Sequence, residues 1–558
     1  MNPSHPAVCE EYPRKLKASD STYPRLMLAA PHGKSGKTVL TLGLLRSLSN
    51  AGKSVQAFKK GPDFIDTGWH TLAAGRVGRN LDAYFMDPEQ IVGLVRDLSE
   101  GVRLSFLEGA MGMYDGLDVE GSCSSAELAK VTDTPVVLVM DVTRMSRTVA
   151  ALVLGCQNLD PDLKIRGVIL NKVRGSRQEN LVRAAIAKYC GLPVIGAIPN
   201  NDALVIPDRH LGLLSSSEVD AIDGVLDEMA EVVSRYVDMD ALVAIADAAG
   251  PLPPARYGDR GEAGACGKLS EPRDDTARNR PVSRSIHGEL LGAVYSNPPI
   301  NLPSIHMQIA PCFSIGSIEQ QKPRIAVLRD PAFCFYYQEN LDALREQGAE
   351  LVFVNSLQDR SLPADIHACY IGGGFPEVFA DVLEANAGFL RSLKNHARRG
   401  LPIYAECGGL MLLSRSITDK GKTYNMAGIL PMDTIMRKQR QGHGYSSIAF
   451  DKPNNWFEQG TVLKGHEYHH SEIINRDAAL NCACKVLRGR GFGDTREGIS
   501  HGEVFASYTH VNVFASPIWA QRMVEKARAF ANAPVTVEYA AGQPLNFDYE
   551  DAQVLIRA

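Results

Sequence analysis

Short apolar runs that alternate with helical patterns occupy two long stretches of the chain. In the first stretch, the apolar runs lie at 25–30, 55–60, 104–109, 135–141, 166–172 and 193–199. Each interval has room for a helix, and the apolar spacing of VLTLGLLRSLSNAG predicts one directly after the first run. Buried strands that alternate with helices are typical of βαβ units, in which helices cover both faces of a parallel sheet. The pattern therefore predicts an α/β, doubly wound domain over residues 25–245.

A second alternating stretch begins at residue 324 and predicts another α/β domain over residues 323–520. Between the two stretches, residues 250–322 are rich in proline, glycine and charge and poor in large apolar side chains. Such a composition cannot bury a core, so we expect a flexible linker there. We expect residues 1–24 to be disordered or extended. Residues 521–558 form a C-terminal extension with a helical start, for which the sequence indicates no role.

Composition narrows the class of protein. A hydrophobic content of 45% and a charged content of 22% are typical of globular proteins, and a net charge of −5 gives no reason to expect a nucleic-acid partner. No apolar run is long enough to cross a membrane, and the first residues lack the apolar core of a signal peptide, so we expect a cytoplasmic protein. The eleven cysteines are scattered, so reduced thiols are expected, including the C-x-C pair Cys482 and Cys484.

A glycine-rich turn, PHGKSGKT, follows the first predicted strand and opens the first predicted helix. It matches the P-loop pattern except that Pro31 replaces the first glycine. In such a turn, backbone N–H groups and the positive helix end hold phosphates, the lysine reaches the outer phosphates, and the threonine ligates Mg²⁺. A glycine-rich turn without a nucleotide is the alternative, and the strand–turn–helix context disfavours it. We predict ATP binding by Gly33, Lys34, Ser35, Gly36, Lys37 and Thr38.

Two acidic clusters follow the next strands of this domain. Asp63 and Asp66 come after the strand at 55–60, and Glu108 and Asp115 come after the strand at 104–109. Open α/β sheets bind ligands at the carboxyl ends of their strands, and Mg²⁺ prefers oxygen ligands. Any one of these carboxylates could instead be a solvated loop residue or a helix cap. The four together indicate metal and substrate binding.

In the second domain, Cys407 lies in LPIYAECGGLMLL, which reads as a strand, a sharp turn and a helix. A nucleophile at such a turn is exposed, and the helix N-terminus lowers its pKa. Backbone N–H groups near Gly408, and near Gly373 and Gly374 in the loop IGGGFPE, are candidates for an oxyanion hole. The candidate base is His510, at the end of the strand-like VFASYTH. A buried thiol is the alternative for a lone cysteine, but this one comes with a turn and a glycine loop.

Four further histidines form a dense group: His443, His466, His469 and His470. Zinc binding is one reading, but the spacing fits no standard structural site and cysteine ligands are absent. We favour loops that shape the substrate cleft.

Several motifs carry a family resemblance. They are SGKT, FKKGPDFIDTGWH, GRNLD, EGAMGMYDG, PVVLVMDVT, GVILNKV, RHLGL, FCFYYQENLDALREQGAE, IGGGFPE, YAECGGLMLL, HEYHHSE and SYTHVNVFASP. In this set and order, the chain resembles the cobyrinate a,c-diamide synthase family of glutamine-dependent tetrapyrrole amidotransferases, over roughly residues 25–215 and 324–517.

The resemblance implies a domain like dethiobiotin synthetase followed by a class I glutamine amidotransferase domain. It implies that MgATP phosphorylates two side-chain carboxylates, a and c, of a corrin-type tetrapyrrole, and that ammonia from L-glutamine then displaces the phosphate. No tightly bound organic cofactor is expected, and a homodimer is left open. The implied residues are Cys407 and His510 for glutamine hydrolysis, Thr38, Asp63 and Glu108 for Mg²⁺, and Asp66, His70, Tyr114 and Asp115 for the substrate.

Departures from the family pattern leave alternatives open. Many class I amidotransferases carry a glutamate two residues after the catalytic histidine, where this chain has Asn512, so what orients His510 is an open question. The motif FKKGPDFIDTGWH also resembles relatives that amidate siroheme or another sirohydrochlorin derivative. An alternative of another class is a partitioning-type P-loop ATPase, although those proteins usually carry lysine where His32 stands and have no cysteine domain.

Overall fold

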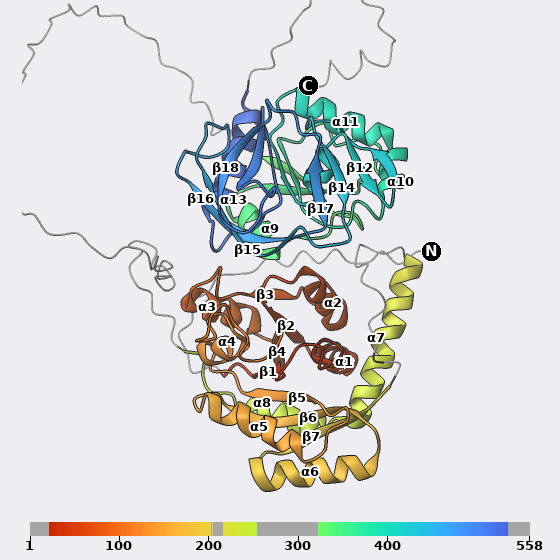
Figure 1. Ribbon diagram of the computed structural model, residues 1–558, viewed down its shortest axis with the longest axis vertical. Helices are drawn as coiled ribbons and strands as arrows, with labels where there is room; N and C mark the ends of the chain where they lie inside the picture. Colours follow the sequence, from red (N-terminus) through yellow and green to blue (C-terminus); the bar gives the residue numbers. More distant parts are fainter. Residues whose placement is uncertain (1–21, 202–203, 205–215, 254–321, 534–558) are drawn as a thin grey trace, which may run out of the picture. The chain divides into compact units, whose positions relative to one another are not determined.

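The structure is a computed structural model that describes residues 22–201, 204, 216–253 and 322–533 (Figure 1). It contains two α/β domains, which confirms the predicted fold class. The expected linker lies almost entirely outside the described residues, as do most of the expected N-terminal and C-terminal tails.

The N-terminal domain is built on a seven-stranded sheet with the order β3-β2-β4-β1-β5-β6-β7, and every strand pair in it is parallel. The short strand β3 is the one that the apolar pattern did not predict. The strands are β1 (Arg25–Ala29), β2 (Val55–Lys60), β3 (Arg79–Leu81), β4 (Leu104–Glu108), β5 (Val136–Asp141), β6 (Ile165–Val173) and β7 (Val194–Pro199).

Helices cover both faces of this sheet. Met27 and Ala29 of β1 pack with α3, α4, α5 and α6, while Leu26 and Leu28 pack with α1, α2, α7 and α8. Successive side chains of a strand point to opposite faces, so a strand covered on both sides needs an unbroken apolar run. The helices are α1 (Lys37–Asn50), α2 (Phe64–Ala74), α3 (Pro88–Ser99), α4 (Ser125–Val131), α5 (Thr148–Leu159), α6 (Ser176–Cys190), α7 (Ser216–Tyr236) and α8 (Met239–Asp247).

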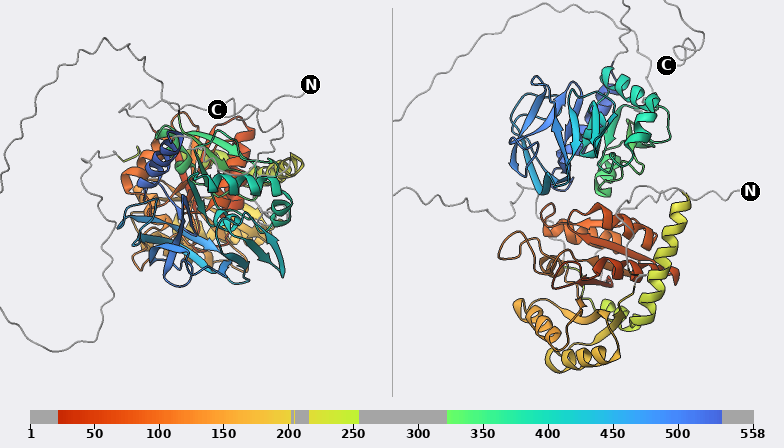
Figure 2. Two further views of the ribbon diagram at one scale, coloured as in Figure 1. Left: turned by 90° about the horizontal axis from the view of Figure 1, so that it is seen from above. Right: turned by 45° about the vertical axis from the view of Figure 1, so that its right-hand side comes forward.

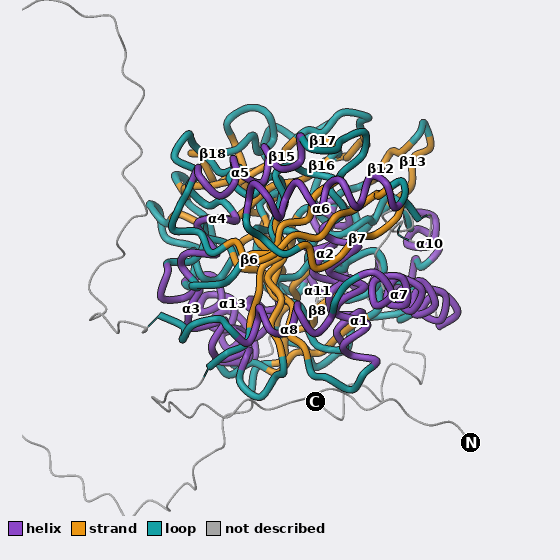
Figure 3. Tube along the Cα trace, turned by 90° about the horizontal axis from the view of Figure 1, so that it is seen from below, coloured by secondary structure: helices purple, strands orange, loops and turns teal. Residues whose placement is uncertain are grey.

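The edge strand β7 shows this covering clearly. Helices α6 and α7 both contact β7, and they belong to the two different helical layers (Figure 3). Helix α7 is the longest helix of the domain, and Figure 2 shows it in yellow-green along the margin of the sheet.

The C-terminal domain is built on a ten-stranded mixed sheet with the order β21-β16-β15-β18-β19-β20-β11-β10-β8-β9. The half from β20 to β9 is parallel and the half from β21 to β20 is antiparallel. The strands are β8 (Arg324–Leu328), β9 (Glu350–Val354), β10 (Ala368–Ile371), β11 (Ile403–Glu406), β15 (Gly442–Phe450), β16 (Val462–His469), β18 (Asn481–Arg488), β19 (Arg496–His501), β20 (Val504–Ser507) and β21 (His510–Val511).

The expectation of regular strand–helix alternation holds only for the parallel half of this sheet. The antiparallel strands connect to one another without helices, and strands such as β16 alternate buried and exposed residues. Antiparallel sheets often carry one solvated face, which gives a weaker apolar signal than a doubly covered strand.

A second sheet and five helices complete the C-terminal domain. The sheet has the order β13-β12-β14-β17, with strands β12 (Ser416–Asp419), β13 (Lys422–Asn425), β14 (Asp433–Met436) and β17 (Ser471–Ile474). The helices are α9 (Gln338–Glu346), α10 (Ala380–Ala385), α11 (Ala387–Arg398), α12 (Gly408–Leu413) and α13 (Ile518–Ala531).

Helix α13 extends the C-terminal domain beyond the expected boundary at residue 520. Trp519, Met523 and Val524 are buried in one core cluster with Tyr370 and Tyr404 of the main sheet. The helical start that the sequence assigned to a C-terminal extension is therefore part of the domain core.

Two further expectations can be compared with the described residues. None of the helices there combines the length and the apolar character that crossing a bilayer requires. Cys482 and Cys484 are buried free thiols on β18.

Candidate functional site

The glycine-rich turn lies between β1 and α1, as the sequence predicts. Gly36 caps α1 with a φ of 91°, a left-handed conformation that favours glycine. A Cβ atom there would lie 2.2 Å from Nδ2 of Asn171, and that nitrogen donates a 2.9 Å hydrogen bond to the Ser35 carbonyl. The amide of Asn171 thus fixes the turn from β6. The N–H groups that begin α1 are positioned for an anion.

The ammonium of Lys37 lies across this turn. Its Nζ donates to the carbonyl of Met111 at 2.7 Å and lies 3.4 Å from the carbonyl of His32. The side chain is buried, and burial together with the nearby Lys59 ammonium lowers the pKa of Lys37 to about 8. A cation in a half-desolvated site interacts strongly with an anion such as a phosphate.

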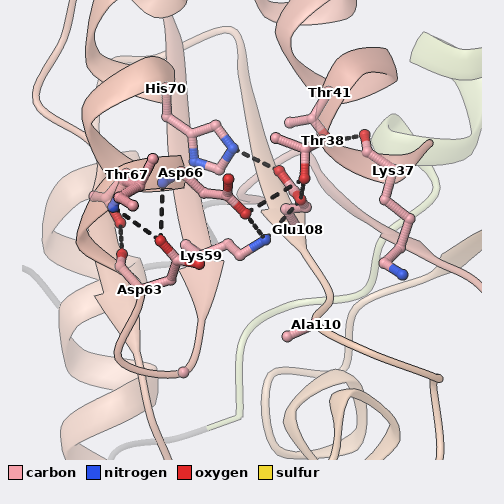
Figure 4. A network of polar contacts seen from close by, with 12 residues as sticks. Lys37, Thr38, Thr41, Lys59, Asp63, Asp66, Thr67, His70, Glu108 and Ala110 are labelled. Atoms are coloured by element: carbon pink, nitrogen blue, oxygen red, sulfur yellow. Dashed lines mark hydrogen bonds and ion pairs between the residues drawn. The ribbon is translucent and has the colours of Figure 1, made fainter. Parts of the chain in front are cut away.

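The carboxyl ends of β2 and β4 hold a network of polar side chains next to this turn (Figure 4). The hydroxyl of Thr38 lies 2.6 Å from Oε1 of Glu108 and 3.3 Å from Oδ2 of Asp66. The Nζ of Lys59 lies 2.7 Å from the same Glu108 oxygen and 2.5 Å from the same Asp66 oxygen. One buried ammonium therefore joins the two carboxylates.

Charge compensation sets the protonation of this network. Burial would raise the pKa of Glu108, but Lys59 and His70 hold that pKa below its usual range. Burial would lower the pKa of Lys59, yet Glu108 and Asp66 raise it above its usual range. The sequence analysis missed Lys59, although a lysine in a buried strand needs an acidic partner. That rule could have identified it.

The structure places His70 differently from the expected substrate contact. The side chain is fully buried in α2, and its Nε2 lies 2.6 Å from Oε2 of Glu108 (Figure 4). Because no part of the ring is accessible, His70 orients the Glu108 carboxylate and does not face a ligand.

Asp63, which the sequence analysis assigns to Mg²⁺, caps a helix in the structure. Its Oδ1 accepts the N–H groups of Ile65 and Asp66 at 2.8 and 2.9 Å, which makes it the N-cap of α2. The oxygens brought together are those of Thr38, Asp66 and Glu108. These hard oxygen donors fit Mg²⁺, although no group of three or more His, Cys, Asp and Glu side chains in the described residues gathers as a metal site.

Tyr114 and Asp115, which the sequence analysis assigns to the substrate, lie in the loop that follows β4. The Asp115 Oδ2 accepts the Gly112 N–H at 2.8 Å, and the Tyr114 hydroxyl donates to the carbonyl of Cys156. Both residues line a cavity of about 360 Å³ with Pro31, Ala151, Leu152, Gly155, Cys156 and Leu159. The cavity combines an apolar floor on α5 with a carboxylate at its edge.

A second cavity, of about 150 Å³, adjoins the glycine-rich turn. It is lined by Gly36, Val39, Leu40, Asn171, Lys172, Pro199, Asn200, Asn201 and Leu204. The sequence reading did not find it, because its residues come from α1, β6 and the segment after β7. It has amide groups and apolar side chains beside a phosphate-binding turn, which suits a nucleotide base.

In the C-terminal domain, Cys407 occupies the predicted turn between β11 and α12. Its φ of 47° and ψ of −98° are a strained conformation for a residue other than glycine. Its N–H donates to the Ser507 carbonyl at 2.7 Å. Burial raises the pKa of the thiol, and the nearby Glu377 carboxyl raises it further, so the expected lowering by the helix N-terminus is wrong. The helix has only six residues, and its field does not outweigh burial beside carboxyl groups.

The glycine loop after β10 lies against this turn. A Cβ atom on Gly408 would lie 3.0 Å from the backbone nitrogen of Gly374, and one on Gly373 would lie 2.3 Å from Cε1 of His510. The structure thus gathers the two glycine segments and the predicted histidine at one place, where only glycine permits so close an approach.

His510 is buried, and it begins the short strand β21 instead of ending the strand-like VFASYTH, since β20 stops at Ser507. Its ring stacks on that of His466, with ring centroids 4.9 Å apart and an interplanar angle of 19°. Burial, with the neighbouring rings of His466 and His469, holds the pKa of His510 well below its usual value. A neutral imidazole can accept a proton, so His510 can act as a general base.

The dense histidine group is placed on strands instead of the expected loops. His466 and His469 are buried on β16, where the His466 ring bonds to the Tyr337 hydroxyl at 2.9 Å and the His469 ring stacks on Tyr508. His443 is exposed on β15, and His470 alone lies between strands. The buried pair belongs to the wall around His510.

Comparison with known protein families identifies both domains. Residues 26–213 match the family model described as the CobQ/CobB/MinD/ParA nucleotide binding domain, and residues 324–518 match the CobB/CobQ-like glutamine amidotransferase domain. A nucleotide-binding domain and a cysteine–histidine amidotransferase domain in one chain define a glutamine-dependent amidoligase.

Relatives that align over nearly their full length show which family of amidoligases this chain resembles. The chain is 36% identical over 497 residues to the cobyrinate a,c-diamide synthase of Magnetococcus marinus, covering 89% of this chain and 96% of that protein. The protein of the same name from Archaeoglobus fulgidus is 37% identical over 513 residues (92% and 99%), and that from Salmonella typhimurium is 33% identical over 504 residues (90% and 98%). The chain belongs to the cobyrinate a,c-diamide synthase family.

Proposed function

We propose that this protein converts the a and c acetate side chains of cobyrinate to amides, using ATP and ammonia released from glutamine at Cys407. The observation that carries the proposal is the presence of a phosphate-binding turn with its carboxylate network and of a cysteine–histidine turn in one chain that aligns with almost the full length of its relatives. ATP is needed because a carboxylate is a poor electrophile, whereas its acyl phosphate has a good leaving group.

Glutamine hydrolysis follows from the geometry around Cys407. His510 takes the thiol proton, and the thiolate attacks the side-chain amide of glutamine. Backbone N–H groups near Gly374 and Gly408 stabilise the oxyanion. His510 then gives its proton to the departing ammonia, and water releases glutamate from the thioester.

The N-terminal domain prepares the carboxylate. The turn from Gly33 to Thr38 holds the phosphates, and Lys37 offsets the charge that moves with the γ-phosphate. Thr38, Asp66 and Glu108 would hold Mg²⁺ through their oxygens, and the ion would supply positive charge to the same phosphates. The ammonium of Lys59 pairs with both Asp66 and Glu108 and offsets part of their negative charge.

The acceptor binds beside this machinery. The cavity at Tyr114 and Asp115 offers an apolar floor for a macrocycle edge, and its rim at Pro31 belongs to the phosphate-binding turn. Ammonia must reach the acyl phosphate without taking up a proton, so we expect a path that excludes water.

A substrate panel tests the proposal. The purified protein is incubated with MgATP, glutamine and either cobyrinate, siroheme or nickel sirohydrochlorin, and products are identified by mass spectrometry, since each amidation replaces OH with NH₂. We expect two successive amidations of cobyrinate. Amidation of only siroheme or the nickel compound would show that the proposed substrate is wrong and the proposed chemistry right. ATP turnover without amidation of any of the three would contradict both the substrate and the chemistry.

A further inference from the structure

As far as the structure describes the chain, one ring nitrogen of the imidazole of His510 has no hydrogen-bond partner that would fix the orientation of the ring. Among the described residues, Nδ1 of His510 is a buried atom without a hydrogen-bond partner, and its side chain is only 1% exposed. A base that takes a thiol proton on Nε2 must carry a hydrogen on Nδ1, so some acceptor has to fix that tautomer.

The position that usually supplies this acceptor is occupied otherwise. Asn512, two residues after His510, uses its Oδ1 to accept the N–H of Phe514 at 3.0 Å. A second buried acid close in sequence, Glu497, uses its Oε1 for the Ser507 hydroxyl at 2.8 Å and for the backbone N–H groups that follow. Neither side chain makes a hydrogen bond or an ion pair with the ring of His510 in the described part of the chain.

Glu406 is the carboxyl that faces Nδ1. Oε2 of Glu406 lies 3.8 Å from Nδ1 of His510. Over the ranges that the structure describes, no other acidic side chain forms an ion pair with this ring. The Val511 N–H donates to its Oε1 at 3.1 Å and the Tyr370 hydroxyl donates to its Oε2 at 3.0 Å. The side chain is 2% exposed. Two donors from β10 and β21 thus hold the carboxyl beneath the ring.

We propose that Glu406 is the positioning residue of the amidotransferase site: it accepts the Nδ1 hydrogen of His510 and so keeps Nε2 free for the thiol of Cys407. The nucleophile and this carboxyl are neighbours in sequence, and the sharp turn at Cys407 lets them act on the ring from different directions. Because a carboxyl–imidazole contact in a buried site is strong, a small rotation that shortens the 3.8 Å separation is favourable.

The proton balance agrees with this role. The thiol proton moves to Nε2 of His510, which makes the ring an imidazolium, and the Glu406 oxygen that accepts the Nδ1 hydrogen then lies beside that positive charge. The Tyr370 and Val511 donors favour the ionised carboxyl, since both bonds are stronger to the charged form. When His510 passes its proton to the departing ammonia, the pair returns to its starting state.

A purely structural role for Glu406 makes a different prediction. If the side chain only ties Tyr370 to the backbone of Val511, then Glu406→Gln should be mild, because it has the same size, keeps an oxygen for the Val511 N–H and offers an NH₂ to the Tyr370 hydroxyl, which can accept as well as donate. If it fixes the tautomer, the glutamine NH₂ donates to Nδ1, forces the hydrogen onto Nε2 and removes the base.

The test measures glutamine hydrolysis and amidation separately. For E406Q we expect the kcat for glutamine to fall by roughly 10²- to 10⁴-fold, as expected for a triad carboxylate replaced by its amide. The KM for glutamine and the amidation driven by ammonium salts should stay near wild-type values. Alkylation of Cys407 by iodoacetamide should slow with the same variant. Wild-type kcat in E406Q would overturn the proposal.

Glu467→Gln is the matched control. Glu467 is also 2% exposed in the same sheet and also accepts two N–H groups, from Arg490 and Gly491, but among the described residues it forms no ion pair with His510. Glutamine hydrolysis should survive in E467Q. An equal loss in both variants would mean that any buried carboxylate of this sheet is needed for the fold, which contradicts a specific role for Glu406.

If E406Q does not fold, it will also lose ammonium-driven amidation. Glu406→Asp is the second variant for that case. Aspartate retains the charge, so its kcat for glutamine should lie between those of wild type and His510→Gln. A folded E406D as inactive as H510Q would overturn the proposal. Because ammonium-driven amidation is measured in every variant, a failure of the proposed overall reaction is distinguished from a failure of this assignment.

Discussion

Lys59, Glu108, Asp66 and Thr38 show how single residues depend on one another in the N-terminal site. A buried ammonium between two carboxylates is stable only as a set, because removing one charge leaves another uncompensated. The same set supplies the oxygens that suit Mg²⁺, so the charge balance that permits folding also prepares the site for a metal–phosphate ligand.

Substitutions of Asp63 distinguish the role of a helix cap from that of a metal ligand. Asparagine caps helices about as well as aspartate, whereas alanine costs about 0.5–2 kcal/mol, so Asp63→Asn should keep both stability and amidation while Asp63→Ala lowers the free energy of unfolding. Urea denaturation and ammonium-driven amidation measure the two effects. Loss of activity in a stable D63N would return Asp63 to the metal site.

Glu406 should make stability depend on pH. Burial raises the pKa of this carboxyl from 4.5 to about 8. Between these values the folded protein keeps a proton that the unfolded chain has released, so stability falls as pH rises through this window. Relative to E406Q, wild type should lose about 1 kcal/mol per pH unit there. Urea denaturation of both proteins across the window measures it, and parallel profiles would contradict the prediction.

At the scale of elements, each site sits where a parallel strand ends and a helix begins. The turn after β1 and the turn after β11 place, respectively, backbone N–H groups and a nucleophile at the carboxyl edge of a sheet. Strand pairing then brings distant segments to these turns, since β4 carries Glu108 to the first and β21 carries His510 to the second.

Gly36→Ala tests the first turn. A left-handed conformation disfavours alanine by about 1–2 kcal/mol, and the new methyl group would displace Asn171 from Ser35. We expect weaker ATP binding, measured by calorimetry, with little change in glutamine hydrolysis. Gly52→Ala is the matched control, because Gly52 has a φ of 71° with open space around it and should cost strain alone. Equal ATP affinity in both variants would contradict this account of the turn.

At the scale of the whole molecule, the two chemistries belong to separate domains and share one reactive nitrogen. Cys407→Ala should abolish glutamine-driven amidation and retain amidation driven by ammonium salts, since the phosphate-binding site is untouched. Product masses with each nitrogen source measure this. Loss of both activities in a protein with wild-type melting behaviour would contradict the division of labour.

The sequence by itself determined most of the parallel N-terminal sheet, the parallel half of the C-terminal sheet, the phosphate-binding turn and the cysteine turn. Each rests on a local pattern: an apolar run of strand length, or glycines at positions where a side chain would collide. The family motifs added the pairing of Cys407 with His510, which local patterns could suggest only as a candidate.

Tertiary structure alone decided which polar groups meet. Lys59 and Glu406 read as ordinary strand residues until pairing sets one beside Glu108 and the other beneath His510. His70 and Asp63 read as ligands until burial and a helix cap assign them other partners. Hydrogen bonds and charge pairs act over a few ångströms between segments far apart in the chain, so no local pattern encodes them, whereas backbone conformation and strand burial are properties of neighbouring residues.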